Sequence, residues 1–243
     1  MSVKTIEVST PRGEMPVHIH RPDGDGSSAV VVLYMDAPGI RRALHDHAER
    51  VAGEGYTALL PDLYYKFDPT ERLNADRLKA GDPEEFKRMH GLVARVHDDE
   101  VLEDTGLMLE ALPDRPAGPW GCVGFCMGGR FGLRAADAFG PDVSAASLLH
   151  PSRLVTDQPD SPHLSVDRVA GGLYLGFGEA DQVTPVSSIP PLREQFVHYG
   201  VEHRIEIFPD ADHGYTMPDR PAYNHDAAER AWAGTLELLR ERL

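Results

Sequence analysis

Residues 124–129 place a thiol inside a glycine-rich turn. The segment reads Gly-Phe-Cys-Met-Gly-Gly, and the apolar run Trp120 to Phe125 leads into it. Glycines two residues before and two residues after Cys126 suit a sharp strand-to-helix turn, because the strained backbone leaves no room for neighbouring Cβ atoms. Such a turn would expose the thiol as a nucleophile. The simpler alternative is a buried cysteine that serves as a small apolar residue.

Two further residues complete a candidate catalytic group. Asp181 follows the apolar run Gly172 to Phe177, and His213 follows the run His203 to Phe208. A histidine can take the thiol proton and return it to the leaving group, while a carboxylate fixes the histidine tautomer and balances the imidazolium charge. The order nucleophile, acid, histidine, with each residue just past a strand, is the chain order of an α/β-hydrolase triad.

Other carboxylates compete for the acid role. Glu179 is the alternative acid in the same loop, and Asp181 could instead cap the helix that follows it. Asp210 and Asp212 lie close to His213 in sequence. We interpret these two as solvated loop carboxylates.

The fold must bring the three candidates to one edge of a sheet. Apolar runs typical of strands covered on both faces are Ala29 to Met35, Tyr56 to Leu60, Trp120 to Phe125, Val143 to Leu149 and Gly172 to Phe177, followed by a last strand at His203 to Phe208. Helical patterns occupy Arg41 to Glu54, a pair within Thr70 to Val96, Asp98 to Leu112, Met127 to Phe139, Ser188 to Tyr199, and a final helix from about Tyr223. Val3 to Val8 and Met15 to His20 predict a hairpin at the sheet edge.

This alternation predicts one doubly wound α/β domain over residues 1–243, with a mostly parallel central sheet and helices on both faces. Reactive groups then belong on the loops at the carboxyl ends of the strands. The helix that begins after Cys126 would favour a thiolate and would present the Met127 backbone N–H to an oxyanion.

Composition limits the classes of partner. The 243 residues carry 24 basic and 39 acidic side chains, a net charge of −15, which disfavours nucleic acid and anionic membranes. Cys122 and Cys126 would lie about 13 Å apart in an extended chain, beyond the roughly 7 Å limit for a disulfide, so we expect free thiols. The segment Met1 to His20 lacks a signal-peptide pattern, and the longest apolar run is too short to span a bilayer. We therefore expect a cytoplasmic protein.

Several segments together resemble the dienelactone hydrolase family over nearly the whole chain. They are Met35 to Gly39, Gly55 to Tyr65, Gly124 to Gly129, the Asp181 loop, and His213 to Tyr215 with Arg220 to Tyr223 downstream. The most specific element is the cysteine in the turn, because most α/β hydrolases have serine there.

The resemblance implies that Cys126, His213 and Asp181 hydrolyse small-molecule esters or lactones through a thioester, without a metal or organic cofactor. It also implies that a carboxylate after an early strand contacts the resting thiol. The matching position is Asp36, where the best-known members have glutamate. The next residue, Ala37, should supply the second oxyanion N–H.

Family enzymes that act on dienelactone hold the substrate carboxylate with arginines, because a planar guanidinium can donate two parallel hydrogen bonds to a carboxylate. No arginine follows His213 within four residues, which speaks against dienelactone as the substrate. The substrate-binding candidates are Arg77, Arg88 and Arg220, together with the aromatic residues Tyr64, Tyr65 and Phe67, which should line the pocket or pack beneath it.

Two other functions stay open at this point. One is a non-catalytic α/β-hydrolase-fold protein that binds a small apolar ligand or a partner. The other is a metal site at the pairs His18/His20 and His45/His47, which we interpret instead as surface histidines because no third ligand has a suitable spacing. The sequence is compatible with a monomer or a homodimer.

Overall fold

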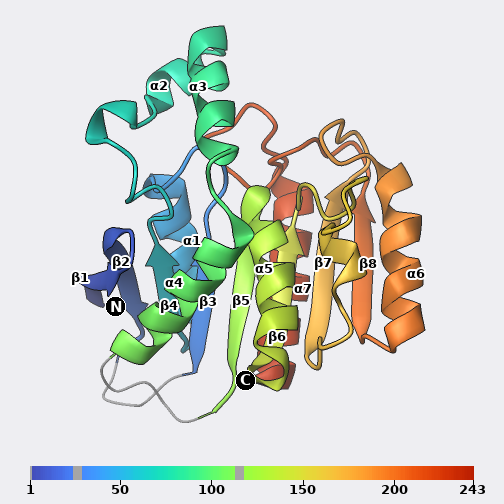
Figure 1. Cartoon of the computed structure of the whole chain (residues 1–243). Helices are drawn as coiled ribbons and strands as arrows, with labels where there is room; N and C mark the ends of the chain where they lie inside the picture. Colours follow the sequence, from blue (N-terminus) through green and yellow to red (C-terminus); the bar gives the residue numbers. More distant parts are fainter. Residues whose placement is uncertain (1, 24–28, 113–117) are drawn as a thin grey trace.

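The apolar runs pair into one central sheet. The structure is a computed structural model that describes residues 2–23, 29–112 and 118–243, and its strands follow the order β1-β2-β4-β3-β5-β6-β7-β8 (Figure 1). They are β1 (Ser2–Thr10), β2 (Gly13–Arg21), β3 (Val30–Tyr34), β4 (Thr57–Pro61), β5 (Trp120–Phe125), β6 (Val143–Leu149), β7 (Gly172–Gly178) and β8 (His203–Phe208). Strands β3 to β8 are parallel, whereas the β1–β2 hairpin joins β4 antiparallel.

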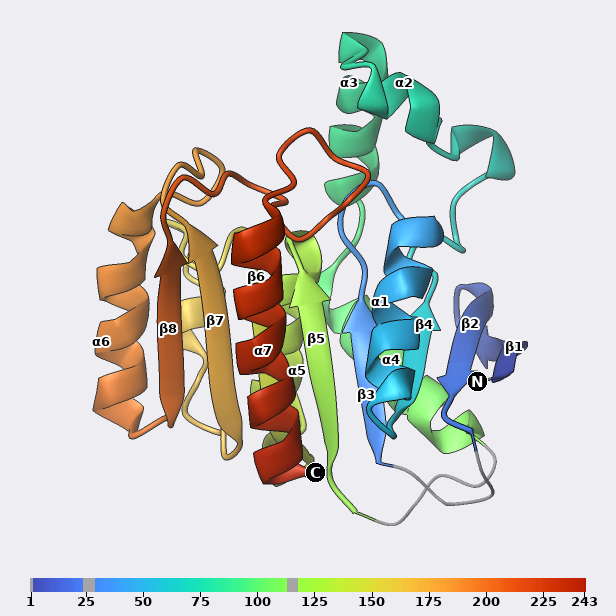
Figure 2. The same cartoon turned by 180° about the vertical axis from the view of Figure 1, so that it is seen from behind.

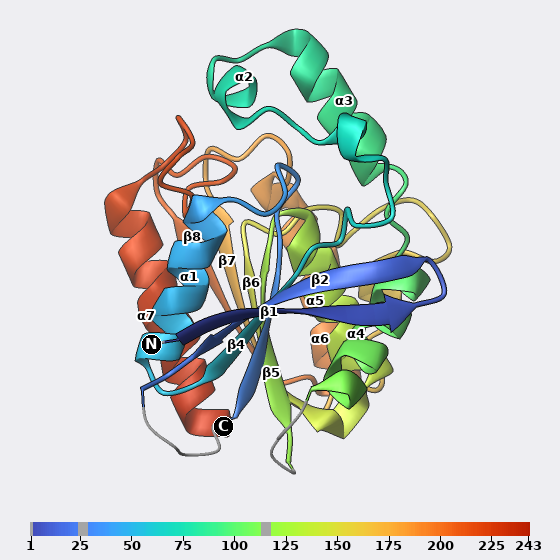
Figure 3. The ribbon, with the colours of Figure 1, turned by 90° about the vertical axis from the view of Figure 1, so that its left-hand side faces the viewer.

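Helices cover both faces of this sheet. The α-helices of the described chain are α1 (Arg42–Gly53), α2 (Ala75–Lys79), α3 (Pro83–Val93), α4 (Asp98–Ala111), α5 (Met127–Ala138), α6 (Ile189–Tyr199) and α7 (His225–Arg242), of which α2 and α3 stand apart from the sheet. Helices α1 and α7 lie on one face, and α4 and α5 lie on the other (Figures 2 and 3). Among the described helices, none combines the length and the apolar composition that crossing a bilayer requires.

The predicted architecture is confirmed. Strands β5, β6 and β8 have the predicted bounds, and the edge hairpin forms where alternation predicted it. The central strands β3, β4, β5 and β7 are buried throughout, which explains why their sequences are apolar without alternation. Helix α6 ends at Gly200, whose left-handed φ of 68° terminates it as expected.

One segment stands away from the sheet. The part of the chain between β4 and α4 carries α2 and α3 and rises above the carboxyl ends of the parallel strands in all three views (Figures 1, 2 and 3). The loop between β8 and α7 lies at the same end. The candidate site therefore sits below this α2–α3 excursion, where a substrate pocket is expected in an open α/β sheet.

Helix α5 lies so close to the end of β5 and to β3 that positions 124 and 128 tolerate only glycine. A Cβ on Gly124 would lie 2.1 Å from the carbonyl oxygen of Gly128, and one on Gly128 would lie 2.2 Å from the carbonyl oxygen of Tyr34. Both distances are far below any real Cβ contact. The glycine spacing seen in the sequence thus reflects backbone-to-backbone packing of the turn.

This packing predicts that Gly128→Ala destabilises the protein by more than about 2 kcal/mol, because backbone atoms must move apart. Urea unfolding measures the change. The matched control is Gly91→Ala, in the exposed part of α3, where an added Cβ meets nothing within 4 Å. That variant should gain about 0.5–1 kcal/mol from helix propensity. Equal stabilities for the two variants would contradict the packing argument.

Candidate active site

Cys126 occupies a strained position between β5 and α5. Its backbone has φ 54° and ψ −116°, which is unusual for a residue with a side chain. Three hydrogen bonds hold this backbone: the Cys126 N–H donates to the Leu149 carbonyl at 3.2 Å, and the Cys126 carbonyl accepts from Gly129 at 3.0 Å and from Ser152 at 2.9 Å. The thiol is partly exposed as a result.

His213 contacts both of the other predicted triad residues. Its Nε2 lies 3.1 Å from the Cys126 Sγ, and its Nδ1 lies 2.7 Å from Oδ2 of Asp181. The other carboxylate oxygen of Asp181 accepts the backbone N–H groups of Val183 and Thr184, both at 2.8 Å. Asp181 therefore also stabilises the turn that follows it, but it does not cap the next helix, because Ser188 occupies the N-cap position of α6. Asp181 is completely buried. Glu179 is exposed.

The surroundings of His213 favour its charged form. Burial alone would lower the pKa of His213, but the hydrogen bonds to Asp181 and Cys126 raise it to about 10. A neighbouring carboxylate stabilises an imidazolium because the opposite charge compensates for lost hydration. This arrangement can hold a proton on Nε2 of His213, the ring nitrogen that faces the Cys126 Sγ.

The loop after β3 has a fixed backbone. The Asp36 carbonyl accepts the Gly39 N–H at 3.0 Å, and the Tyr64 hydroxyl donates to the Ala37 carbonyl at 2.7 Å. Because the Asp36 carbonyl and the Ala37 N–H belong to one planar peptide, the first of these bonds also sets the direction of that N–H. Met127 is the first residue of α5, where a backbone N–H has no partner within the helix.

Asp36 is engaged by a cation in the structure. Its two carboxylate oxygens accept from Nη1 and Nη2 of Arg41 at 2.5 and 2.9 Å. Arg41 also binds Asp219, in the loop after His213. Among the described residues no hydrogen bond joins Asp36 to Cys126, in contrast to the thiol contact that the resemblance implied.

The arginine candidates in the excursion have carboxylate partners. Arg77 contacts Asp82 at 2.8 Å, and both Arg77 and Arg88 contact the fully buried Glu85. Arg88 also donates to two backbone carbonyls of the same segment, those of Thr70 and Arg72. These guanidinium groups therefore hold the excursion together.

The remaining candidates lie around the excursion. The guanidinium of Arg220 lies 5.6 Å from the ring centroid of Phe86 in α3. Tyr64 and Phe67 line a cavity of about 300 Å³ below the excursion. The Tyr65 hydroxyl instead bonds Thr10 and Asp104, so this side chain braces the edge hairpin.

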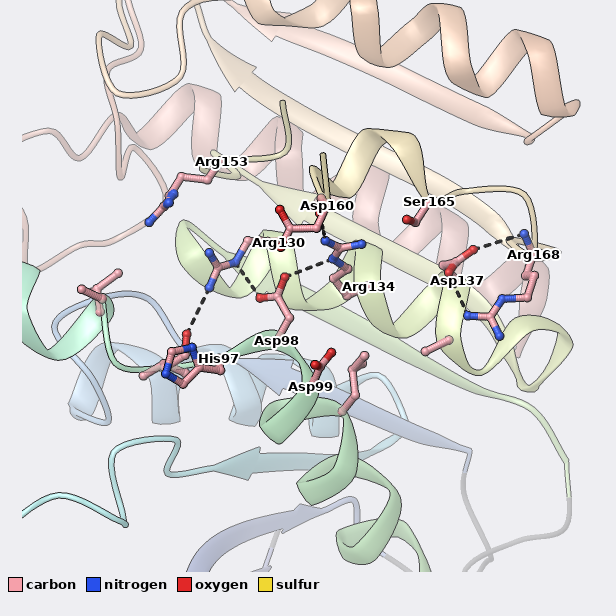
Figure 4. Close-up of a pocket in the computed structure, with 15 residues that line it drawn as sticks. His97, Asp98, Asp99, Arg130, Arg134, Asp137, Arg153, Asp160, Ser165 and Arg168 are labelled. Carbon is pink, nitrogen blue, oxygen red and sulfur yellow. Dashed lines mark hydrogen bonds and ion pairs between the residues drawn. The ribbon is translucent and has the colours of Figure 1, made fainter. Parts of the chain in front are cut away.

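A second cavity, of about 540 Å³, runs along α5 (Figure 4). Arg130 and Arg134 extend from α5 toward Asp98, and both make ion pairs with it, at 2.9 and 3.0 Å. Arg153, one residue after Ser152, lies on the other side of the same cavity (Figure 4). The lining is thus strongly polar, with cations largely balanced by carboxylates.

Two residues that lie near the Cys126 thiol were not predicted from the sequence. The Ser152 Oγ lies 3.8 Å from the Cys126 Sγ. His150 is fully buried, has a φ of 37°, and packs edge-on against the ring of His213 with centroids 5.4 Å apart. Burial moves the pKa of His150 well below its usual value, so this ring is neutral. Their position just after β6 was the signal that could have identified them.

The interpretation of the paired histidines as surface residues is wrong for two of them. His20 and His47 are buried, and the His47 ring stacks on Phe125 with centroids 4.9 Å apart. His20 Nε2 lies 3.0 Å from His45 Nδ1. In the described part of the chain no three histidine, cysteine or acidic side chains are arranged to hold a metal ion.

Comparisons with known proteins place the chain in a family. The sequence profile of the dienelactone hydrolase family matches residues 15–243. A Synechocystis protein provisionally named a carboxymethylenebutenolidase is 27% identical and covers 100% of this chain and 99% of the relative. A Salmonella typhimurium protein with the same provisional name is 31% identical over 92% of this chain and 82% of the relative.

The solved structures agree with this assignment. The crystal structure of a Klebsiella pneumoniae protein, provisionally described as a dienelactone hydrolase, has a TM-score of 0.83 at 26% identity and covers 99% of this chain and 100% of that one. The α/β-hydrolase fold, which was expected from the chain order of the triad candidates and from the family resemblance, is thereby confirmed. Since the family profile extends over most of its length, the chain belongs to the dienelactone hydrolase family.

Proposed function

We propose that the protein hydrolyses carboxylic esters or lactones of small molecules, with Cys126 as the nucleophile, His213 as the acid–base group and Asp181 as its orienting carboxylate. The observation that carries the proposal is the position of His213, whose two ring nitrogens lie within hydrogen-bond distance of Cys126 and Asp181. Family membership supports the hydrolase class.

In the first half-reaction, Nε2 of His213 holds the proton that comes from the thiol, and Sγ attacks the carbonyl carbon. The resulting oxyanion would be stabilised by the backbone N–H groups of Met127 and Ala37. When the tetrahedral intermediate collapses, the bond to the alkoxide breaks and His213 returns the proton to that oxygen. The acyl group remains on Cys126 as a thioester.

In the second half-reaction, a water molecule gives a proton to His213 and attacks the thioester carbonyl. Collapse then releases the carboxylic acid, and the proton returns to Sγ. An alkoxide leaves a tetrahedral centre more easily than an amine, which favours esters and lactones over peptides. Buried Asp181 keeps Nδ1 protonated, so Nε2 can accept the thiol proton.

Trapping of the acyl-enzyme tests the nucleophile. Intact-mass spectrometry after mixing with p-nitrophenyl acetate should show one acetyl adduct, and Cys126→Ala should abolish both the adduct and turnover. Cys122→Ala is the matched control, because Cys122 is fully buried in β5 and its burial raises the pKa of its thiol to about 12. An adduct that persists in Cys126→Ala would refute the assignment.

The tautomer argument predicts the effect of Asp181→Asn. The amide can still accept the Val183 and Thr184 N–H groups, but its NH₂ group would face Nδ1 and favour the wrong tautomer. We expect kcat to fall on the order of 10²- to 10⁴-fold. Glu179→Gln, in the exposed part of the same loop, should retain kcat within about twofold. Similar losses in the two variants would argue against Asp181 as the orienting acid.

The raised pKa of His213 also predicts a pH-dependent contribution to stability. The pKa is about 10 in the folded protein and about 6.5 in the unfolded chain. The folded state therefore binds the proton more tightly, so the stabilisation is fully present below pH 6.5 and disappears as the pH rises through 10. Urea unfolding of the wild type and His213→Gln should show the largest difference near pH 6. A difference that does not change with pH would contradict this prediction.

A further inference from the structure

Arg41 joins two loops of the candidate active site. Its Nε donates to Oδ2 of Asp219 at 2.5 Å, and its Nη2 donates to Oδ1 of Asp219 at 3.2 Å and to Asp36 at 2.9 Å. Its Nη1 donates to Asp36 at 2.5 Å and to the Gly39 carbonyl at 3.1 Å. All five N–H groups that a guanidinium possesses are thereby used.

The burial of this group makes the contacts strong. The side chain of Arg41 is 10% exposed and that of Asp36 is 6% exposed, whereas Asp219 lies nearer the surface at 36%. Burial alone would lower the pKa of Arg41, but the two carboxylates raise it above its ordinary value, so the group stays charged. Lysine could not replace it, because one ammonium cannot form two bidentate pairs in a plane.

The two loops carry groups with different tasks. Asp36 comes directly before Ala37, and Gly39 comes two residues after Ala37. Because Arg41 binds both Asp36 and Gly39, it holds the chain on both sides of the Ala37 N–H. Asp219 belongs to the loop that follows His213. Arg41 and Asp219 are 178 residues apart in the sequence, and their ion pair links these two loops.

We propose that Arg41 is a positioning residue for ester hydrolysis, which clamps the Asp36 loop to the His213 loop so that the Ala37 N–H and the His213 ring face the same substrate carbonyl. This inference rests on the proposed function. In this chain Asp36 acts through Arg41, and its carboxylate does not serve as the partner of the resting thiol.

The test compares Arg41 with its neighbour Arg42, which is exposed and pairs with Asp46 and Glu49 on its own helix. Hydrolysis of p-nitrophenyl acetate is measured for Arg41→Lys, Arg41→Gln and Arg42→Gln. Both Arg41 variants should lose kcat about tenfold to a hundredfold with KM within about twofold, because oxyanion contacts act in the transition state. Arg42→Gln should retain wild-type constants.

Removing Arg41 leaves the buried Asp36 without its cation, which endangers folding. Asp219→Asn avoids this problem, because it weakens only the half of the clamp that reaches the histidine loop. This variant should fold, and its kcat should fall about threefold to tenfold at unchanged KM. A folded Asp219→Asn variant with wild-type kcat would overturn the clamp.

Alkylation of Cys126 by iodoacetamide distinguishes a misplaced oxyanion N–H group from general damage to the active site. This reaction needs the Cys126–His213 pair but no oxyanion hole, so its pH profile should keep its midpoint in the Arg41 variants and in Asp219→Asn. Alkylation that falls in parallel with kcat, or full activity in Arg41→Lys, would overturn the inference. If the wild type hydrolyses the ester and the Arg41 and Asp219 variants do so equally well, the clamp is refuted and the proposed function stands. If iodoacetamide alkylates the wild type but no ester is hydrolysed, the proposed function is refuted, and the role of Arg41 with it.

Discussion

The close contact between α5 and the sheet is the constraint on which the rest of the site depends. The backbones of Gly124 and Gly128 meet without side chains between them, and the Cys126 backbone takes up the resulting strain. Hydrogen bonds from the neighbouring β6 loop to the Cys126 backbone hold this conformation. The cysteine side chain is therefore partly exposed at the carboxyl end of β5. The parallel strands β7 and β8 then place Asp181 and His213 at the same edge of the sheet.

Much of this arrangement could be predicted from sequence because it depends on local pattern. Fully buried parallel strands are apolar throughout, so the bounds of β5 and of the almost fully buried β6 were readable. Strand β8 is an edge strand in which only Phe208 is buried, and its bounds were nevertheless predicted correctly. The strand ends then located Cys126, Asp181 and His213. The shared edge follows from the parallel topology alone. The same reasoning, applied to the end of β6, would have pointed to the loop that contains His150 and Ser152.

Side-chain pairing over long separations could not be predicted in this way. No periodicity relates Arg41 to Asp219, and the attraction of Asp36 to a buried guanidinium is decided by packing of α1 against the sheet. The burial of His20 and His47 has the same origin, since a polar residue type gave no sign of the apolar surroundings that its strand or helix would supply. Such pairs are set by tertiary structure.

The buried Glu85 gives the α2–α3 excursion an internal centre of its own. Arg77 and Arg88 bind it, and its carboxylate also accepts the Asn74 backbone N–H, so these polar bonds join α2 and α3 to each other. The excursion lies above the site but forms no ion pair with Cys126, Asp181 or His213 among the contacts described above. Substitutions on the surface of α2 and α3 could therefore change the shape offered to substrates without removing a hydrogen bond of Cys126, Asp181 or His213.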